Sequence, residues 1–139
     1  MNLVVKKYGG TSVASIAKIS KIAENLIDEY NSKKKLVVVL SAMGNSTDKL
    51  VNLSSRVSKN PNTRDFDMLL SSGEQVSVSL LSMILNERGI AAKSYTGWQA
   101  GIKTNIDYSN ARILSIDTKR IKADLKKGFV VVVAGFQGI

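Results

Sequence analysis

Residues near the start of the chain have the types and spacing to bind a phosphate group. Lys7 precedes the glycine pair Gly9 and Gly10, where an apolar strand pattern changes to a helical one. Glycines carry no Cβ and adopt φ > 0 readily, so an anion can approach their backbone amides closely. Lys7 would add a full positive charge. The spacing matches neither the Walker nor the Rossmann pattern, so a plain strand-to-helix turn with a surface lysine is the alternative.

A second polar loop follows the apolar run 36–40. It spans residues 41–48 and reads Ser-Ala-Met-Gly-Asn-Ser-Thr-Asp. Ligands of open α/β sheets bind at the carboxyl ends of strands, so this loop is a candidate binding segment. Its candidate polar contacts are Ser41, Asn45, Ser46 and Thr47. The alternative is that Ser46 or Thr47 only caps the helix that follows, because caps prefer these residue types.

Glu74 is the candidate acidic residue. It lies in the segment 71–75, which we expect to open a helix through a capping box formed by Ser72 and Gln75. An acidic side chain in the first helical turn complements the helix dipole, which is the plainer interpretation. The more specific interpretation is that Glu74 binds the amino group of a substrate.

The elements that must position these residues follow from hydrophobic periodicity. Helical spacing predicts helices over 13–30, around 50–57, from 71–75 to Gly89, and from an Asp117 cap to Gly128, with a short helical turn at 65–70. Continuous apolar runs predict strands at 36–40 and 129–134. Strands are also predicted at 4–8 and 90–95, with an edge strand at 112–116. We assign Trp98 to packing. The predicted fold is one α/β domain, three-layered, with a mainly parallel sheet.

Composition excludes several kinds of chemistry. The 139 residues include no cysteine and no histidine, so catalysis would have to work without thiol or imidazole. The longest apolar run, 129–134, is far shorter than the roughly 20 residues that a membrane helix needs. We therefore expect a cytoplasmic protein with no membrane partner.

The formal charge of +9 raises the possibility of nucleic-acid binding. Basic clusters lie at 33–35, 119–122 and 126–127. These are expected helix ends or polar helix faces, and no aromatic residues are interleaved for base stacking. A solvated surface, with no nucleic acid as partner, is the expectation.

Taken together, the motifs resemble those of the aspartate kinases of the amino-acid kinase family, in particular the monofunctional bacterial ones. The resemblance spans the chain. It rests on the segments 7–12, 41–44 with 47–48, 72–74, 94–97 with 99–101, and 134–138. The loop 41–48 and the Gly73-Glu74 pair are the segments that separate aspartate kinases from other kinases of this family.

The resemblance implies transfer of the ATP γ-phosphoryl group to the β-carboxylate of L-aspartate. It implies that Lys7 holds the phosphates and that the amides of Gly9 and Gly10 stabilise the transferring group. Tyr8 and Ser41 complete the implied ATP-binding set. The implied aspartate-binding residues are Thr11, Asn45, Ser46, Thr47, Asp48 and Glu74, the last pairing with the substrate ammonium. No metal ligand is implied within the chain, so Mg²⁺ would be bound through ATP.

The resemblance also implies that residues 1–139 form only the N-terminal, substrate-binding part of a catalytic domain. Aspartate kinases continue beyond the glycine turn at 135–138 with a nucleotide-binding half and ACT domains. We therefore expect the isolated chain to be inactive and the whole enzyme to be a homo-oligomer. Two alternatives stay open: a kinase of the same family with a different acceptor, and a non-catalytic basic binding module.

Overall fold

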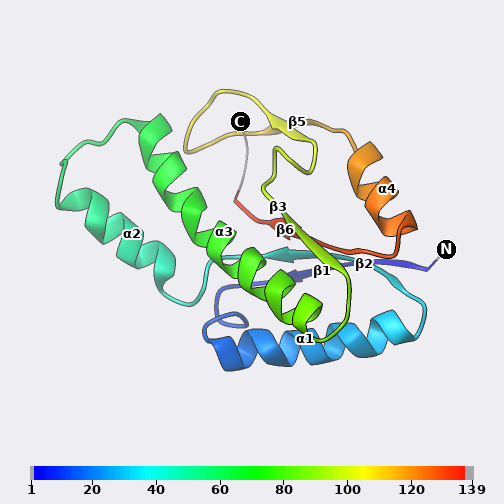
Figure 1. The fold of residues 1–139 in the computed structure, drawn as a ribbon. Helices are drawn as coiled ribbons and strands as arrows, with labels where there is room; N and C mark the ends of the chain where they lie inside the picture. Colours follow the sequence, from blue (N-terminus) through cyan, green and yellow to red (C-terminus); the bar gives the residue numbers. More distant parts are fainter. Residues whose placement is uncertain (1, 137–139) are drawn as a thin grey trace.

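The computed structural model describes residues 2–136. A four-stranded parallel sheet forms the centre of the fold (Figure 1). Its strands, in spatial order, are β1 (Leu3–Tyr8), β2 (Lys35–Leu40), β6 (Val130–Ala134) and β3 (Ala92–Tyr95). All three strand pairs are parallel, so the four carboxyl ends lie at one edge. The predicted α/β class with a mainly parallel sheet is confirmed.

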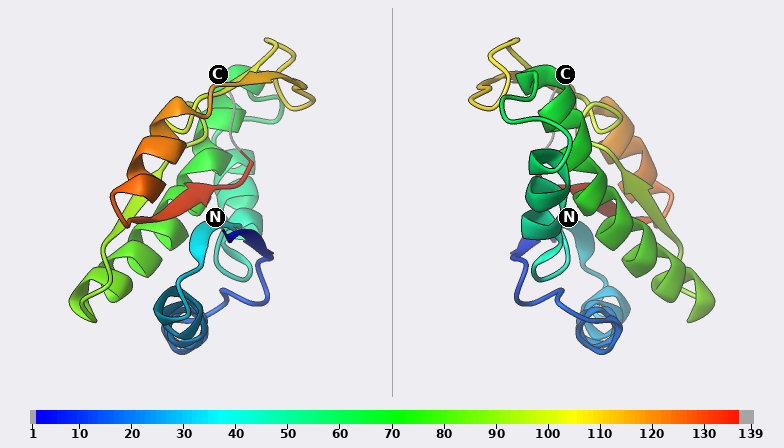
Figure 2. Two further views of the ribbon diagram at one scale, coloured as in Figure 1. Left: turned by 90° about the vertical axis from the view of Figure 1, so that its right-hand side faces the viewer. Right: turned by 90° about the vertical axis from the view of Figure 1, so that its left-hand side faces the viewer.

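Helices cover both faces of this sheet, as Figures 1 and 2 show. On one face α1 (Ile16–Asn31) and α3 (Thr63–Glu87) bury a large apolar cluster, and α2 (Ser46–Ser55) packs against α3. On the other face α4 (Lys119–Lys126) packs on β6. Neighbouring valines divide between the layers: Val38 and Val132 face α1 and α3, whereas Val37 and Val131 face α4. The valine-rich strands are therefore buried on both sides, which is why their sequences do not alternate.

The first helix begins later than its apolar pattern predicts. Residues 9–15 form a loop, and α1 starts at Ile16, with the Ser15 hydroxyl accepting the amide of Lys18 at 3.2 Å. Val13 is completely buried, but as a loop residue inserted into the core. The prediction that the glycine turn opens directly onto a helix is therefore wrong, because burial rather than helicity explains the apolar residue at this position.

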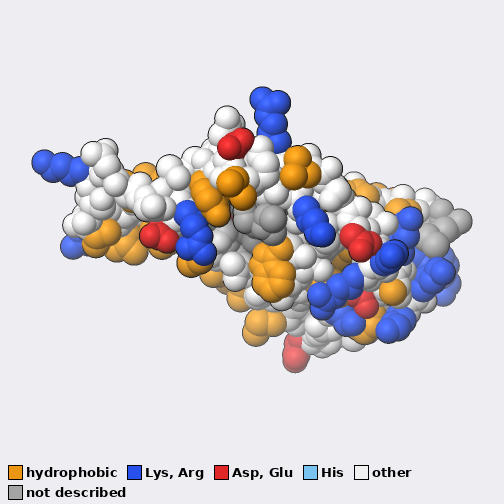
Figure 3. All heavy atoms as spheres, turned by 90° about the horizontal axis from the view of Figure 1, so that it is seen from above, with side chains coloured by type: hydrophobic (Ala, Val, Ile, Leu, Met, Phe, Trp, Pro, Cys, Tyr) orange, Lys and Arg blue, Asp and Glu red, His pale blue; other side chains and the backbone are white. Residues whose placement is uncertain are grey.

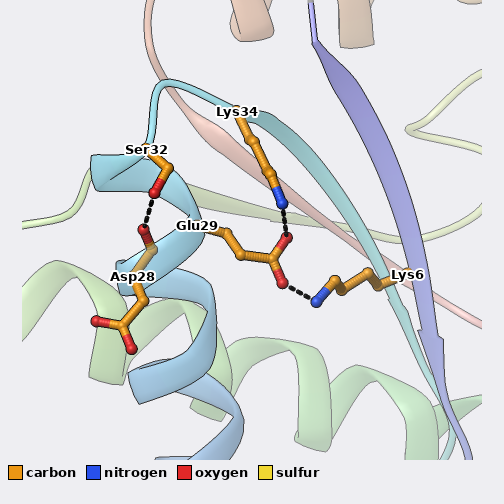
Figure 4. A network of polar contacts seen from close by, with 5 residues as sticks. All are labelled: Lys6, Asp28, Glu29, Ser32 and Lys34. Carbon is orange, nitrogen blue, oxygen red and sulfur yellow. Dashed lines mark hydrogen bonds and ion pairs between the residues drawn. The ribbon is translucent and has the colours of Figure 1, made fainter.

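The far end of α1 is tied to the sheet by charge (Figure 4). Glu29 accepts a hydrogen bond from Lys6 of β1 and lies 3.7 Å from the ammonium of Lys34. The hydroxyl of Ser32 closes the helix by donating to the Asp28 carbonyl at 3.0 Å. Because Lys6 is used here, it is not available to the carboxyl edge of the sheet.

One helix replaces the two predicted over 65–89. The helix α3 runs unbroken through residues 71–75, and its N-terminus is capped by Asn62, whose side-chain oxygen accepts the amide of Arg64 at 2.9 Å. The Ser72 hydroxyl donates back to the Leu69 carbonyl at 2.6 Å and caps nothing. The capping box is therefore wrong, because serine can satisfy its hydroxyl within a helix.

The helix α3 has the length and composition of a possible membrane span, with a mean hydropathy of 1.4 over its most apolar window. Yet 44% of that window is buried within the fold, and Val78, Leu81 and Leu85 pack in the core. Its apolar character is that of a core helix.

A separate antiparallel ribbon joins β4 (Ile102–Thr104) to β5 (Ile113–Ile116). The strand expected at 112–116 therefore exists, but it pairs outside the main sheet, and β4 was not predicted. Thr118 occupies the N-cap position of α4, one residue after the predicted cap, although Asp117 accepts the amide of Lys119 at 3.1 Å.

Gly101, before β4, should be essential for stability. Its φ is +91°, and a Cβ there would lie 2.1 Å from the Asp117 carbonyl oxygen. We expect Gly101→Ala to destabilise the protein by about 2–5 kcal/mol, combining left-handed strain with overpacking. Gly89→Ala is the control, because its φ is +82° but a Cβ would meet nothing within 4 Å; its cost should be about 1–2 kcal/mol. Urea unfolding followed by circular dichroism measures both, and equal losses would contradict the prediction.

Candidate active site

The loops that follow β1, β2 and β6 are joined at the carboxyl edge by backbone hydrogen bonds. Gly44 donates to the Gly10 carbonyl at 2.9 Å, and Gly135 donates to the Leu40 carbonyl at 2.8 Å. Ser41 donates to the Tyr8 carbonyl at 3.1 Å, which continues the strand pairing into the loops. The loop residues singled out in the sequence are thereby held beside one another.

Gly9 and Gly10 both matter because they carry no side chain. A Cβ at Gly10 would lie 3.2 Å from the Ala42 carbonyl oxygen and 3.3 Å from that of Gly44. A Cβ at Gly9 would meet nothing within 4 Å, so this residue borders open space. Neither glycine has positive φ, so the expected left-handed conformation is not used. Gly10 permits the close approach of the neighbouring loop, and Gly9 leaves room for a ligand.

Three consecutive backbone donors at this turn are free. The amides of Gly9, Gly10 and Thr11 donate to no acceptor within residues 2–136. Consecutive amides without partners make a concavity suited to an anion. The residues present therefore fit a phosphate group, although no helix N-terminus contributes, since α1 begins only at Ile16.

Lys7 supplies an unpaired charge next to these amides. It is exposed, it lies level with Val39 on the α4 side of the sheet, and it forms no ion pair with any described residue. The adjacent Tyr8 points the other way and packs against the main core. Of the two residues, the structure therefore brings only the Lys7 side chain to the exposed side of β1, whereas the backbone of Tyr8 pairs with β2.

Glu74 reaches the same edge from α3. A Cβ on its neighbour Gly73 would lie 3.0 Å from the Ala42 Cβ, and Ser77, one turn on, donates to the Ser41 carbonyl at 2.6 Å. Ala42 also contacts Gly10, so the glycine pair and Glu74 meet through one loop residue. Glu74 lies in the interior of α3 and not in a first helical turn, so its charge does not serve the helix dipole there.

The carboxyl of Glu74 is buried, with 6% of the residue exposed. Burial raises the pKa of Glu74, and the backbone amides of Glu74 and Ala42 oppose the shift by hydrogen bonding to it. Its Oε2 atom has no hydrogen-bond partner within the described residues. A buried carboxylate with an unsatisfied oxygen is suited to receive a cationic group such as an ammonium.

The remaining predicted contacts surround the loop after β2. Asn45 occupies the N-cap position of α2 without a side-chain hydrogen bond, and Ser46, Thr47 and Asp48 form the first turn. The interpretation of Ser46 or Thr47 as the cap is wrong, so these side chains are not committed to capping. Thr11 is exposed, and its carbonyl accepts a hydrogen bond from Lys18 at 2.9 Å.

Sequence reasoning missed a groove of about 710 Å³ between α3 and the β4–β5 ribbon. Trp98 and Phe136 line it, together with Ser71 and Gln75 of α3. Trp98 is 59% exposed, so its assignment to packing is wrong. The glycine before Trp98 was the sequence feature that indicated a surface position. Only the fold shows that Trp98 faces the groove between α3 and the β4–β5 ribbon. Within residues 2–136, no three acidic or histidine side chains cluster to hold a metal ion.

Comparison with known proteins defines the class of this α/β domain. Residues 2–139 match the amino acid kinase family, and the chain belongs to that family. It is 54% identical over 139 residues to an aspartokinase of Bacillus sp. (strain MGA3) and 54% identical to aspartokinase 2 of Bacillus subtilis (strain 168). Each match covers the whole chain but 34% of the relative, so the chain spans about a third of their length.

A solved structure supports the same relationship. The aspartate kinase from Synechocystis superposes with a TM-score of 0.83 at 46% identity, over all of this chain and 22% of that one. The resemblance to aspartate kinases found in the sequence is therefore confirmed.

The buried carboxyl of Glu74 predicts a pH effect on stability. Because its pKa is raised in the folded protein, the folded state binds more protons than the unfolded state above the ordinary glutamate value of 4.5, and stability falls as pH rises through the raised pKa. Glu74→Gln should remove this dependence and increase stability at pH 7. Glu87→Gln, at an exposed position on the same helix, should change neither the pH dependence of stability nor the stability at pH 7. Urea midpoints between pH 4 and pH 8 measure this, and a Glu74→Gln curve parallel to that of the unmodified chain would contradict it.

Proposed function

We propose that this chain is the phosphate- and acceptor-binding part of an aspartate kinase, which transfers the ATP γ-phosphoryl group to the β-carboxylate of L-aspartate. One observation carries the proposal: the free amides at 9–11 and the buried carboxyl of Glu74 meet at Ala42, on the same edge of the sheet. A phosphate donor and an amino-acid acceptor bound there would be neighbours.

The donor side consists of positive charge and N–H groups. MgATP, when bound, supplies the phosphoryl group, and the metal would arrive with the nucleotide. Lys7 would neutralise phosphate oxygens, and the amides of Gly9, Gly10 and Thr11 would hold the transferring group. Phosphoryl transfer relies mainly on positioning and charge stabilisation, so donors fixed in the fold are suited to it. The aspartate carboxylate, with a reference pKa of about 3.9, is ionised at neutral pH and needs no histidine base.

The acceptor side selects for an amino group. An ammonium beside Glu74 would satisfy the unpaired oxygen and favour the ionised carboxylate, whereas an acceptor without an amino group would leave a buried charge unpaired. Thr11, Asn45, Ser46 and Thr47 offer polar contacts for the rest of the acceptor, with Asp48 next to them in α2. This favours an amino-acid acceptor over a nucleotide or a simple carboxylic acid.

The chain would work as part of a longer enzyme. Its relatives are about three times as long, so we assign residues 1–139 to the substrate-binding part and place most nucleotide contacts elsewhere. We expect a cytoplasmic homo-oligomer whose partners are L-aspartate and ATP, with no nucleic-acid or membrane partner.

A chimera tests the reaction. Joining this chain to the remaining part of Bacillus subtilis aspartokinase 2 should give ADP release that depends on L-aspartate. Lys7→Ala should lower kcat about 100-fold, because it removes a fixed charge from the transferring group. Lys59→Ala removes an exposed lysine from a turn and should leave kcat unchanged. The 139-residue chain alone should show no aspartate-dependent turnover; turnover that Lys7→Ala abolishes would refute that expectation.

Succinate tests the acceptor assignment, since it keeps the carboxylates of aspartate and lacks the ammonium. The chimera should use succinate at least about tenfold less efficiently than aspartate, as expected when a buried group loses its partner. Glu74→Gln should raise the KM for aspartate and narrow this preference, with the KM for ATP unchanged. Equal kcat/KM for both acceptors in the unsubstituted chimera would show that Glu74 does not bind the substrate ammonium.

A further inference from the structure

A second groove, of about 480 Å³, lies away from the candidate active site along the outer edge of β3. Its walls come from α3 and α4, and its lining includes Ser82, Asn86, Ser94, Gln99, Arg120 and Asp124. Ser79 is the lining residue of α3 nearest to Glu74, five residues or about 7.5 Å along the helix, and neither Glu74 nor any residue of 9–11 or 41–48 lines the groove. The groove is therefore not part of the acceptor site.

The strand β3 is the last of its sheet, so one of its sides has no neighbouring strand. The amide of Val130 donates to the Ala91 carbonyl at 2.8 Å, so Ala91 and every second residue after it direct their backbone N–H and C=O groups toward β6. The N–H and C=O groups of Ala92, Ser94 and Thr96 accordingly point outward, away from β6. Ala92 and Ser94 line the groove, and their outward backbone groups form its floor.

Two amide side chains close the ends of this floor. The amide of Ala92 donates to the Asn86 side-chain oxygen at 3.0 Å, and the Asn86 nitrogen donates to the Ala92 carbonyl at 3.1 Å. The amide of Thr96 donates to the Gln99 side-chain oxygen at 3.0 Å, and its carbonyl accepts the amide of Ala100 at 3.0 Å. Asn86 and Gln99 thus take the positions that an added strand would occupy.

Only Ser94 keeps an outward N–H and C=O without a partner among the described residues. Adding a strand needs several consecutive free groups, and here both flanks are blocked, a known way to protect a sheet edge. What remains is a notch one residue long. It offers one donor and one acceptor, which suits a small molecule better than a peptide strand.

The charges in the walls favour an anionic group on that molecule. Asp124 is already engaged by the Tyr95 hydroxyl and by the Lys93 ammonium at 3.0 Å. The Arg120 guanidinium lies 4.8 Å from the Tyr95 ring centre and pairs with no carboxylate of residues 2–136. Figure 3 shows lysine and arginine side chains gathered at the end of the molecule that carries α4. Ser82 adds a buried hydroxyl oxygen that has no partner in the described part of the chain.

We propose that this groove binds a small molecule with a carboxylate next to an N–H donor, the class of the free α-amino acids. The ligand N–H would donate to the Ser94 carbonyl, and its carboxylate would accept the Ser94 amide within the field of Arg120. This site is independent of the proposed kinase reaction.

Hydrogen exchange tests the premise. In the protein alone, the Ser94 amide should exchange at least about tenfold faster than those of Lys93 and Tyr95, which bond to β6. Equal protection of the three amides would show that the Ser94 amide is occupied and would overturn the proposal.

Glycine is the probe for binding, titrated into the ¹⁵N-labelled chain. We expect shifts at the Ser94 amide and at the side-chain amides of Asn86 and Gln99. Acetate and methylamine, which each keep half of the pattern, should bind about tenfold more weakly. Arg120→Gln should weaken glycine binding by a similar factor, and Lys122→Gln, an exposed position on the same helix, should not. Ser94→Pro should abolish binding by removing only the outward N–H, a substitution that edge strands tolerate.

Three further outcomes would overturn the proposal. Glycine could shift only residues around 9–11 and Glu74, which would place it in the acceptor site. The Ser94 signal could move with protein concentration in the absence of glycine, which would mean that a second copy fills the notch. Glycine could also cause no shift up to its solubility limit, and this outcome is informative even if Ser94→Pro does not fold.

Discussion

The approach of two glycines to Ala42 is the contact on which the candidate active site depends. Gly10 brings the loop after β1 against the Ala42 carbonyl, and Gly73 brings α3 against its methyl group. At either position a side chain would push the backbones apart at distances where close-packed interiors have no spare room. With both glycines in place, the free amides at 9–11 and the carboxyl of Glu74 come to one edge of the sheet. The chemistry of the site is therefore a result of packing as much as of charge.

The parallel sheet explains why the polar residues gather at that edge. Parallel strands send all their carboxyl ends in one direction, and the valines of β2 and β6 are buried between two helical layers. Polar side chains have no place within those strands, so they appear in the loops that follow. The same geometry leaves Lys7 unpaired on the open side of β1, while its neighbour Lys6 turns toward Glu29 and anchors α1.

The outer edge of β3 follows a different rule. There the strand ends the sheet, and the backbone groups that a neighbour would have used are taken by the amides of Asn86 and Gln99, except at Ser94. The carboxyl edge concentrates loop residues, whereas this side exposes main chain. These two polar surfaces are separate: one follows from strand direction and the other from strand order.

Local pattern was sufficient for the main framework. The four strands of the sheet were predicted from the sequence, two of them as continuous apolar runs, and helical spacing identified α1 and α4 to within a few residues. The motifs around Lys7, Ser41 and Glu74 pointed to the family. These features depend on neighbours in the chain, so the sequence by itself determined them.

Tertiary structure decided what depends on contacts between distant residues. It buried Val13 as a loop residue, it carried α3 unbroken through residues 71–75, and it packed Gly73 of that helix on Ala42. It also paired β4 with β5 outside the sheet, exposed Trp98, and buried the Glu74 carboxyl without a partner for one oxygen. The physical reason is that burial and hydrogen bonding are settled between segments far apart in the chain, whereas periodicity reports only which side of each segment is apolar.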